Sequence, residues 1–338
     1  MDAIAEWQGI DYRRFQREIV GGDQPAILRD AVAHWPVVAA SGESFSALVD
    51  YLKPLCKPGP VTALVADPSV EGRFFYRNDL RGVNFQRGQT ELANAMDRLL
   101  ETASVDRPQA IAIQAVPIRE RLPSFEDHNP QSLLPADIAP TLWMGNRGTV
   151  APHFDVHDNL ACVVAGARRF TLFPPEQTAN LYPGPVLHTP AGVPVSMVDL
   201  SRPDLALYPK FTHALAVAQQ SLLQPGDAIY MPALWWHGVE STDRVNMLVN
   251  YWWGGVPDAG VSPYDSLLHS MMSIADLSER KRCAWEHFFD YFVFKTDAQP
   301  SEHLPTDLDD LVTGMNNQQI TMLRQSLARR LHSGPTKK

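Results

Sequence analysis

The sequence predicts a mainly β fold with flanking helices, in which a double-sheet jelly roll follows an α/β extension and precedes a set of helices. Three observations lead to this fold class. Short apolar segments that resemble strands, with Pro/Gly turn signals between them, recur from residue 110 to residue 253. Two helical patterns precede them, and after Gly254-Gly255 the composition changes to helical stretches rich in aromatic residues. We therefore expect an N-terminal extension packed on the core (1–140), a β core (141–256) and a C-terminal helical region (257–338).

The N-terminal region mixes helices with strands. Residues 1–40 hold short apolar patches broken by glycines and prolines, and we expect a helix and then a strand there. Ser44 stands directly before the apolar pattern of residues 45–52, which indicates a helix capped by Ser44 and ending before Pro54. Residues 61–66 are predicted to form a strand, and the aromatic triplet 74–76 is expected to pack in the core as a short strand or turn.

A second helix is predicted over residues 91–102, with Thr90 as its N-cap. Its apolar side chains share one face, which should point to the core: Leu92, Met96, Leu99 and Leu100. Residues 110–116 are predicted to form a buried strand. The segment 117–140, rich in proline and charge, is predicted to be a long loop that shapes the mouth of a substrate site.

The β core begins where residues 141–144 restart the sheet, with Trp143 expected in the core rather than as a platform for a substrate. Between Phe173 and Pro225 lie eight prolines, which predict irregular chain containing a short strand at 196–199 and a helical turn at 211–218. Strands at 221–224, 228–231 and 245–253 complete the sheet, and Pro225-Gly226-Asp227 signals a turn.

Helical patterns return in residues 263–296 and 307–331, and the tail 335–338 is expected to fray. The first of these stretches carries more apolar side chains than an exposed helix tolerates, among them Trp285, Phe288 and Phe292. We expect these side chains either to pack on the β core or to pair with a second subunit, so a homodimer through the C-terminal helices is one expected assembly.

Composition narrows the class of protein. The net charge of −9 argues against a broad cationic surface, and nucleic acid is therefore an unlikely partner. The three cysteines, Cys56, Cys162 and Cys283, fit neither a disulfide framework nor a CxxC zinc site and are expected to be reduced thiols. No basic and apolar leader and no apolar run near the ~18 residues of a membrane span is visible. A cytoplasmic protein without a membrane partner is expected.

The most informative stretch is His153-Phe154-Asp155, because residues two apart on a strand point to the same face. An imidazole and a carboxylate would then converge without a turn. The best third ligand is His237, which follows the predicted strand 228–231. Two histidines and one carboxylate occupy one face of an octahedron and leave positions open, which is the arrangement of non-haem Fe(II) oxygenases.

His157 shares the parity of His153 and Asp155 and would add a fourth ligand if the strand continued through it. The turn signal Asp158-Asn159 makes a residue at the barrel mouth the preferred interpretation of His157.

Several features at fixed distances from these ligands resemble one family: Asn159, residues 166–170, residues 172–177, Tyr182-Pro183, Trp235-Trp236-His237 and residues 249–252. Together they resemble the cupin-like JmjC oxygenases, the Fe(II)- and 2-oxoglutarate-dependent group that includes the asparaginyl hydroxylase acting on hypoxia-inducible factor. The resemblance covers residues 143–253 and implies a cupin jelly roll, or double-stranded β-helix.

The resemblance also assigns roles to residues. It implies that His153, Asp155 and His237 bind Fe(II), that Asn159 and Asn250 contact 2-oxoglutarate, and that Arg168 takes the place of the lysine that pairs with the far carboxylate of this cosubstrate. The family's threonine three residues before the first ligand is replaced by Val150, and Thr149 stands one place earlier. The tyrosine that relatives carry on an upstream strand has no counterpart in residues 110–116, which contain Gln114. Whether Thr149 or Gln114 supplies the missing contacts to 2-oxoglutarate stays open.

The activity that the resemblance implies is hydroxylation of a C–H bond of a protein or peptide side chain by a 2-oxoglutarate-dependent dioxygenase. The same chemistry on a small metabolite or a free amino acid is one alternative. A metal-binding cupin that acts as an isomerase or as a non-catalytic sensor is another, and such a protein would not need Arg168 or Asn250.

Overall fold

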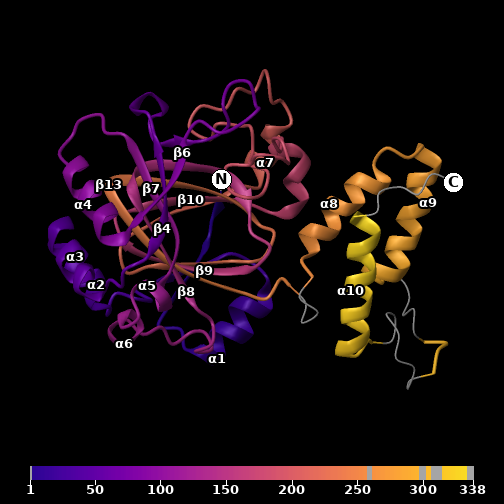
Figure 1. The fold of residues 1–338 in the computed structure, drawn as a ribbon, viewed down its shortest axis with the longest axis horizontal. Coiled ribbons are helices and arrows are strands. Elements are labelled where there is room, and N and C mark those ends of the chain that lie inside the picture. The colour runs from indigo at the N-terminus through magenta and orange to yellow at the C-terminus, as the bar shows by residue number, and fades with distance from the viewer. Residues whose placement is uncertain (1, 257–260, 297–301, 306–313, 333–338) are drawn as a thin grey trace. The chain divides into compact units, whose positions relative to one another are not determined.

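A computed structural model describes residues 2–256, 261–296, 302–305 and 314–332 of the chain. The chain divides into two compact units, Met1–Gly255 and Val256–Lys338. The first unit is a mixed, largely antiparallel sheet with flanking helices, which confirms the predicted fold class. Figure 1 shows its strands surrounding a common interior, with helices on the outside.

The strands of the first unit all belong to one continuous sheet, whose longest path runs β2-β3-β12-β9-β13-β8-β7-β4-β6. Their bounds are β1 (Asp2–Ala3), β2 (Ala5–Gln8), β3 (Ala26–Arg29), β4 (Pro60–Ala66), β5 (Arg73–Phe74), β6 (Gln86–Glu91), β7 (Ala110–Pro117), β8 (Pro140–Phe154), β9 (Asp158–Ala165), β10 (Arg168–Phe173), β11 (Gln219–Leu223), β12 (Ala228–Met231) and β13 (Trp236–Trp253).

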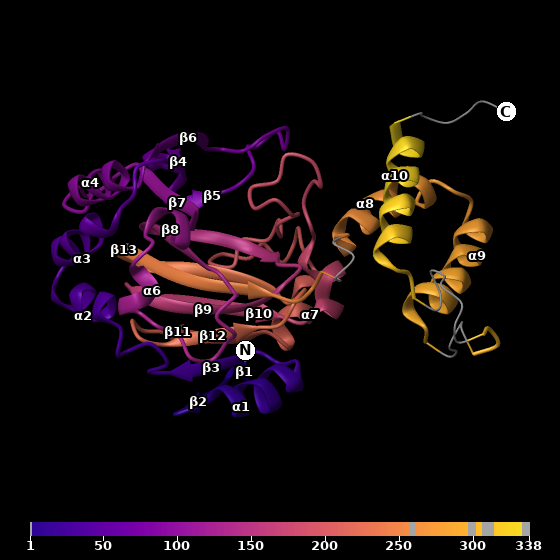
Figure 2. The same ribbon diagram turned by 60° about the horizontal axis from the view of Figure 1, so that its bottom comes forward.

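The helices of the first unit are α1 (Tyr12–Arg14), which continues through η1 (Phe15–Ile19) and η2 (Val20–Gly22), α2 (Pro36–Glu43), α3 (Phe45–Leu52), η3 (Lys53–Leu55), η4 (Pro68–Val70), α4 (Leu92–Thr102), α5 (Ile118–Arg121), α6 (Phe125–His128), η5 (Pro175–Leu181) and α7 (Phe211–Ala216). Figure 2 shows α2, α3 and α4 grouped on one side of the sheet. The largest apolar cluster fills the space between these helices and the sheet.

Two long strands, β8 and β13, close the jelly roll. The first half of β13 pairs with β10 and with the second half of β8, whereas its second half pairs with β9 and with the first half of β8. A register shift between Ser241 and Val245 marks the place where β13 passes from one partner to the other. A second apolar cluster, which includes Phe170, Ile229 and Leu248, lies inside the roll.

Local sequence signals predicted several elements correctly. Ser44 caps α3, since its hydroxyl accepts a hydrogen bond from the amide of Ala47 at 3.0 Å. The strand at 228–231, the helical turn after residue 211 and the turn at Pro225-Gly226-Asp227 are also confirmed. Asp227 reinforces that turn by accepting from the amide of Gln224 at 3.0 Å.

The prediction for the second helix was wrong in two details. Thr90 is not its cap, because Thr90 pairs with Val61 in the β4–β6 ladder and α4 begins after Glu91. Leu100 is 37% exposed, and Ala95 takes its place on the buried face. For Thr90, strand pairing prevailed over the local pattern. For Leu100, the rotation of the helix on the core did.

Residues 1–40 hold the predicted helix and strand, but also two strands (β1 and β2) and one helix (α2) that were not predicted. The predicted strand at 196–199 is wrong, since only an isolated bridge joins Ser196 to Pro183. The predicted loop 117–140 contains α5 and α6, whose residues Ile118 and Phe125 are fully buried.

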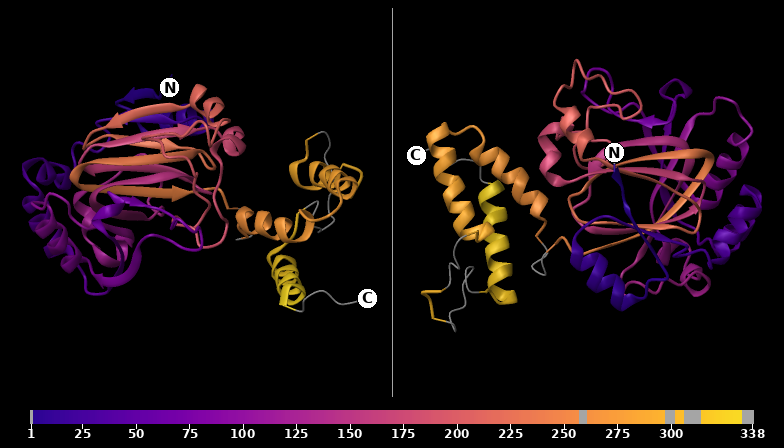
Figure 3. Two further views of the ribbon diagram at one scale, coloured as in Figure 1. Left: turned by 90° about the horizontal axis from the view of Figure 1, so that it is seen from above. Right: turned by 180° about the vertical axis from the view of Figure 1, so that it is seen from behind.

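The described residues of the second unit form α8 (Pro263–Ile274), α9 (Glu279–Phe289), η6 (Asp290–Phe294) and α10 (Asn317–His332). Figure 3 shows these elements from two sides. The predicted helical stretch 307–331 is described only from residue 314, and its first part, like the tail 335–338, lies outside the described residues. Within the described part of the chain, no helix has the length and apolar character needed to span a bilayer.

Candidate metal centre

Two histidines face each other across neighbouring strands. His153 near the end of β8 and His237 near the start of β13 are direct partners in the antiparallel ladder. Their ring centroids lie 4.3 Å apart with an interplanar angle of 53°. Asp155 follows β8 by one residue, and its carboxylate Oδ2 lies 3.8 Å from Nε2 of His237. One ligand atom from each of these three residues lies within 4.8 Å of the others, a spacing that suits a metal ion.

Backbone carbonyls orient both imidazoles. Nδ1 of His153 lies 3.1 Å from the carbonyl oxygen of Ala151, and Nδ1 of His237 lies 3.1 Å from that of Trp235. A carbonyl oxygen only accepts, so Nδ1 is the donor in each ring, and in a neutral imidazole with this tautomer Nε2 keeps its lone pair. Both rings therefore present the nitrogen that a divalent metal would bind.

The electrostatics of the group favour the metal-binding protonation states. Burial, followed by the proximity of His237, lowers the pKa of His153 to about 4. Burial acts to raise the pKa of Asp155, but His237 and His153, with hydrogen bonds from Trp252 and Asn159, outweigh it and hold that pKa below its ordinary value. Near neutral pH, His153 is therefore neutral and Asp155 ionised, as ligands of a cation must be.

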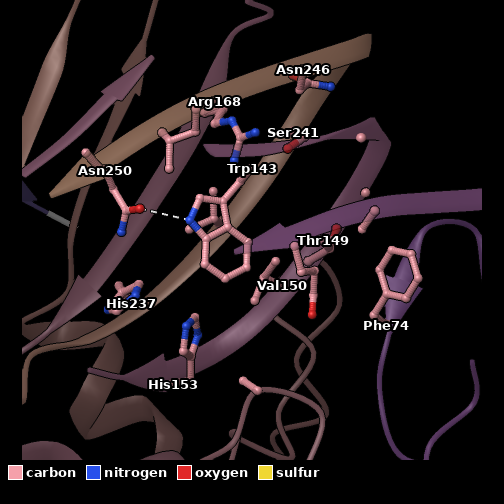
Figure 4. A pocket seen from close by; sticks show the side chains of 18 of the residues that line it. Phe74, Trp143, Thr149, Val150, His153, Arg168, His237, Ser241, Asn246 and Asn250 are labelled. Atoms are coloured by element: carbon pink, nitrogen blue, oxygen red, sulfur yellow. Dashed lines mark hydrogen bonds between the residues drawn. The ribbon is translucent and has the colours of Figure 1, made fainter. Parts of the chain in front are cut away.

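The three residues line a cavity of about 440 Å³ inside the jelly roll. Its wall includes apolar side chains of the inner cluster, such as Phe170 and Leu248. Figure 4 shows His153 and His237 at one end of this cavity and Arg168 at the other.

Arg168 is the first residue of β10, only 9% exposed. The tight turn before β10 requires glycine at position 166. Gly166 has a φ of +68°, and a Cβ atom on Gly166 would lie 2.5 Å from the carbonyl oxygen of Val245. Burial lowers the pKa of Arg168 to about 10. Its Nε is buried without a hydrogen-bond partner among the described residues. A buried cation with an unpartnered donor calls for an anion, because an unpaired buried charge is costly.

The two asparagines named from the sequence lie beside Asp155. Nδ2 of Asn159 donates to Oδ2 of Asp155 at 3.1 Å, and Nδ2 of Asn250 donates to Oδ1 of Asn159 at 3.3 Å. Both side chains are buried and line the cavity. Thr149 and Gln114 also line it, so the structure leaves both available for the open cosubstrate contacts.

Other expectations about the site need correction. The segment 117–140 does not shape the cavity, since none of its residues is among those that line it and several pack in the main core instead. Trp143 packs against the inner apolar cluster as expected, but it also lines the cavity and donates to Oδ1 of Asn250 at 2.8 Å. His157 lies in a bend after β8 and is outside the described three-residue group.

One contact to the group had no role in the sequence-based interpretation. Nε1 of Trp252 donates to Oδ2 of Asp155 at 3.1 Å. Trp252 stands two residues after Asn250 on β13, so strand parity would have placed both on the same face. Phe74 and Arg87 also line the cavity and were not predicted to do so.

Comparison with known proteins agrees with this fold. The chain is 38% identical over 112 residues to "Lysine-specific demethylase JMJ31" of Arabidopsis thaliana, which is 33% of this chain and 20% of that protein. It is 40% identical over 114 residues to "Jumonji C domain-containing protein 5" of Drosophila melanogaster, which is 33% of this chain and 26% of that protein. These alignments thus span about a quarter or less of the two relatives.

A third similarity extends over most of both chains. The human "Bifunctional peptidase and (3S)-lysyl hydroxylase JMJD7" is 27% identical over 293 residues, which cover 78% of this chain and 87% of that protein. The model of the cupin-like domain family matches residues 12–259, well over half of the chain. With its jelly roll and this match, the chain belongs to the cupin-like domain family.

Proposed function

We propose that this protein is an Fe(II)- and 2-oxoglutarate-dependent oxygenase that hydroxylates a C–H bond. One observation carries the proposal: the His153–Asp155–His237 group lines the same cavity as Arg168, whose buried Nε has no hydrogen-bond partner among the described residues. A set of three metal ligands alone would fit many cupins. The cation at the opposite end adds a reason for a diacid to lie between them.

His153, Asp155 and His237 would hold the metal through Nε2 atoms and a carboxylate oxygen. Three protein ligands leave positions for a bidentate cosubstrate and for O₂. When bound, Fe(II) supplies the redox chemistry by which O₂ oxidises 2-oxoglutarate to succinate and CO₂ and hydroxylates the substrate.

Arg168 would orient the cosubstrate. Its planar guanidinium can hold a carboxylate through two parallel hydrogen bonds, and burial makes such a pair stronger than one at the surface. Ser241, the ladder partner of Arg168, also lines the cavity and would offer its hydroxyl group to the same carboxylate. The apolar wall between Arg168 and the histidines keeps water from the reacting end of the cavity.

A protein or peptide side chain is the proposed substrate, and a small metabolite or free amino acid is the alternative. The cavity extends past Thr149 to Phe74, which leaves room beside the proposed cosubstrate site. Gln114 also lines it. Among the described residues that line it, Asp155 is the only acid, while Arg87 and Arg168 are cations. An ammonium group would thus meet no free carboxylate, so we expect the reacting side chain to be uncharged or acidic.

A cupin isomerase or a non-catalytic metal sensor is the competing function from another class. Such a protein would bind a metal at the same three residues but would gain nothing from a buried arginine without a partner. Since Arg168 is costly to bury, its presence favours the oxygenase.

The test is turnover of the iron-loaded protein with 2-oxoglutarate and three peptide sets that differ only in the central residue, which is asparagine, aspartate or lysine. The proposal expects succinate formation and a product about 16 mass units heavier, carried by the uncharged or acidic residue. Turnover of the lysine peptides alone would contradict the substrate class. Metal binding without any succinate, unchanged in an Arg168→Met variant, would favour the sensor.

For the C-terminal unit we propose pairing with a second copy of the chain. Several large apolar side chains of α9 and η6 are exposed: Trp285 is 46%, Phe288 57%, Phe292 50% and Phe294 67% exposed. Apolar groups in such number favour burial in an interface. A homodimer would bury these side chains and would need no different partner protein.

A further inference from the structure

Two tryptophans converge on the carboxylate of Asp155 by different routes. Trp252 donates directly, from Nε1 to Oδ2 at 3.1 Å. Trp143 acts through two amides: its Nε1 donates to Oδ1 of Asn250 at 2.8 Å, Asn250 donates to Asn159 at 3.3 Å, and Asn159 donates to Oδ2 of Asp155 at 3.1 Å. Figure 4 shows the bond from Trp143 to Asn250.

The chemistry of the two ends fixes the direction of this chain of hydrogen bonds. An indole N–H can only donate, and an ionised carboxylate can only accept. If the amide of Asn250 were reversed, its NH₂ group would face the N–H of Trp143, donor against donor. If the amide of Asn159 were reversed, its oxygen would face the carboxylate of Asp155. Each link therefore points toward Asp155, and both amide orientations follow without further assumption.

Burial gives these bonds consequences. Asn159 is 4% and Asn250 2% exposed. Water cannot replace a lost hydrogen-bond partner of a buried amide, so losing one would destabilise the protein by much of the desolvation free energy of that amide. The two indoles also contact each other edge to face, with ring centroids 5.8 Å apart at 89°. The donors that reach Asp155 thus stand on rings that restrict each other's movement.

We propose that Trp143 and Trp252 are positioning residues that hold the Asp155 carboxylate in its ligand orientation before a metal binds. Trp252 acts directly, and Trp143 acts through Asn250 and Asn159. This assignment rests on the proposed metal site, but not on any turnover by it.

The chain of hydrogen bonds from Trp143 to Asp155, called the relay below, also limits the hydrogen bonds that Asn159 and Asn250 can donate to a cosubstrate. In each amide one N–H and the oxygen are already engaged within the protein, so each has one N–H left to offer. Their first role is therefore toward Asp155.

Co(II) titration of the purified full chain tests the proposal, because Co(II) reports ligand geometry by its visible absorption and needs no turnover. Trp143→Phe and Trp252→Phe keep an aromatic six-membered ring but remove the pyrrole ring with its N–H donor. Trp35→Phe is the matched control, since Nε1 of Trp35 donates to the carbonyl oxygen of Pro130 at 2.7 Å in the main core and Trp35 does not line the cavity.

We expect Trp252→Phe to weaken Co(II) binding by about 10- to 100-fold, as the loss of an outer-shell partner does elsewhere. Trp143→Phe should weaken it less and alter the visible spectrum, and the double variant should lose less than the product of the two factors, since both act on one carboxylate. Trp35→Phe should match the unaltered protein in both readouts.

If Trp143→Phe and Trp252→Phe both bound Co(II) as tightly as the unaltered protein and with its spectrum, the proposal would be wrong. An effect of Trp252→Phe alone would overturn the relay through the amides. Should a variant not fold, the indole N–H resonances of the unaltered protein decide: Zn(II) should shift those of Trp143 and Trp252 but not that of Trp35, and unshifted signals would refute the assignment. Intact Co(II) binding without succinate formation would instead count against the proposed function alone.

Discussion

His153 and His237 are opposite each other in the antiparallel ladder of β8 and β13, with ring centroids 4.3 Å apart. They are distant in sequence, and the pairing of two strands is what makes them neighbours. Because the ladder holds both backbones, strand pairing alone sets the two histidines opposite each other. Asp155 joins it from the first turn after β8.

Replacing a ligand should remove the metal but keep the fold. Asp155→Ala or His153→Ala should weaken Co(II) binding by more than about 100-fold, beyond what loss of an outer-shell partner costs. Thermal unfolding of the metal-free variants should stay cooperative, because the apolar clusters carry the fold. His157→Ala is the control, since His157 lies outside the group, and a comparable loss of metal in that variant would contradict the three-ligand set.

Arg168→Met should separate binding from stability. We expect the Kd for 2-oxoglutarate, measured by calorimetry on the Co(II)-loaded protein, to rise by at least about 30-fold, because a buried charge pair loses about 2 kcal/mol or more with one partner. The ligand-free variant should unfold at the same or a higher temperature, since an unpartnered buried charge is removed.

The neighbouring Arg169 provides the control for that experiment. It forms a surface ion pair with Glu240 at 2.6 Å, and both side chains are more than 40% exposed. Arg169→Met should leave the Kd for 2-oxoglutarate unchanged and shift stability little. Equal effects of the two substitutions would show that Arg168 has no special role.

The metal-free protein should lose stability as the pH falls below about 6.5, the ordinary pKa of histidine. The folded-state pKa of His153 is lowered to about 4, so between these values the unfolded chain binds a proton that the folded chain does not. The contribution of His153 to the free energy of unfolding is therefore fully present above pH 6.5 and is lost as the pH falls toward 4. Asp155, whose pKa is also lowered, adds to the loss at lower pH. Urea unfolding from pH 7 to 4.5 measures this, and His153→Gln should give a shallower decline. Parallel curves for the two proteins would exclude His153 as the cause.

Ser44→Ala should lower the free energy of unfolding by about 1 kcal/mol, because the cap on the amide of Ala47 is lost. Ser46→Ala, within the same helix and exposed, is the control and should be neutral or slightly stabilising. Urea denaturation gives both values. A loss in the Ser46 variant as large as in the Ser44 variant would mean that the cap bond is not responsible.

The proposed pairing of C-terminal units is measured by analytical ultracentrifugation. The unaltered chain should sediment as a dimer, and Phe288→Ser with Phe292→Ser should shift it to a monomer, because two exposed apolar anchors are removed. Leu207→Ser, at a residue of the first unit that is 63% exposed, should not change the mass. A monomeric unaltered chain would end the proposal.

Patterns of short range were sufficient for much of the fold and for bringing His153 and Asp155 together, whereas Asn159, Arg168 and Asn250 were named only through the family resemblance. The i, i+2 spacing of His153 and Asp155 follows from strand geometry alone, and the Ser44 cap and the turn at Gly226 depend on neighbouring residues. Local pattern failed where pairing between distant strands competed with it, as at Thr90, which sits in a ladder with β4.

Long-range register supplied the rest. No spacing in the chain places His237 opposite His153, or Trp143 within reach of Asn250, because these contacts depend on how β8 and β13 align over their whole length. The segment 117–140 has the composition of a loop, and only its burial against the core shows that it stays away from the cavity. The local sequence determines which side chains share a face of a strand. Which residues they contact depends on the packing of segments that lie far apart in sequence.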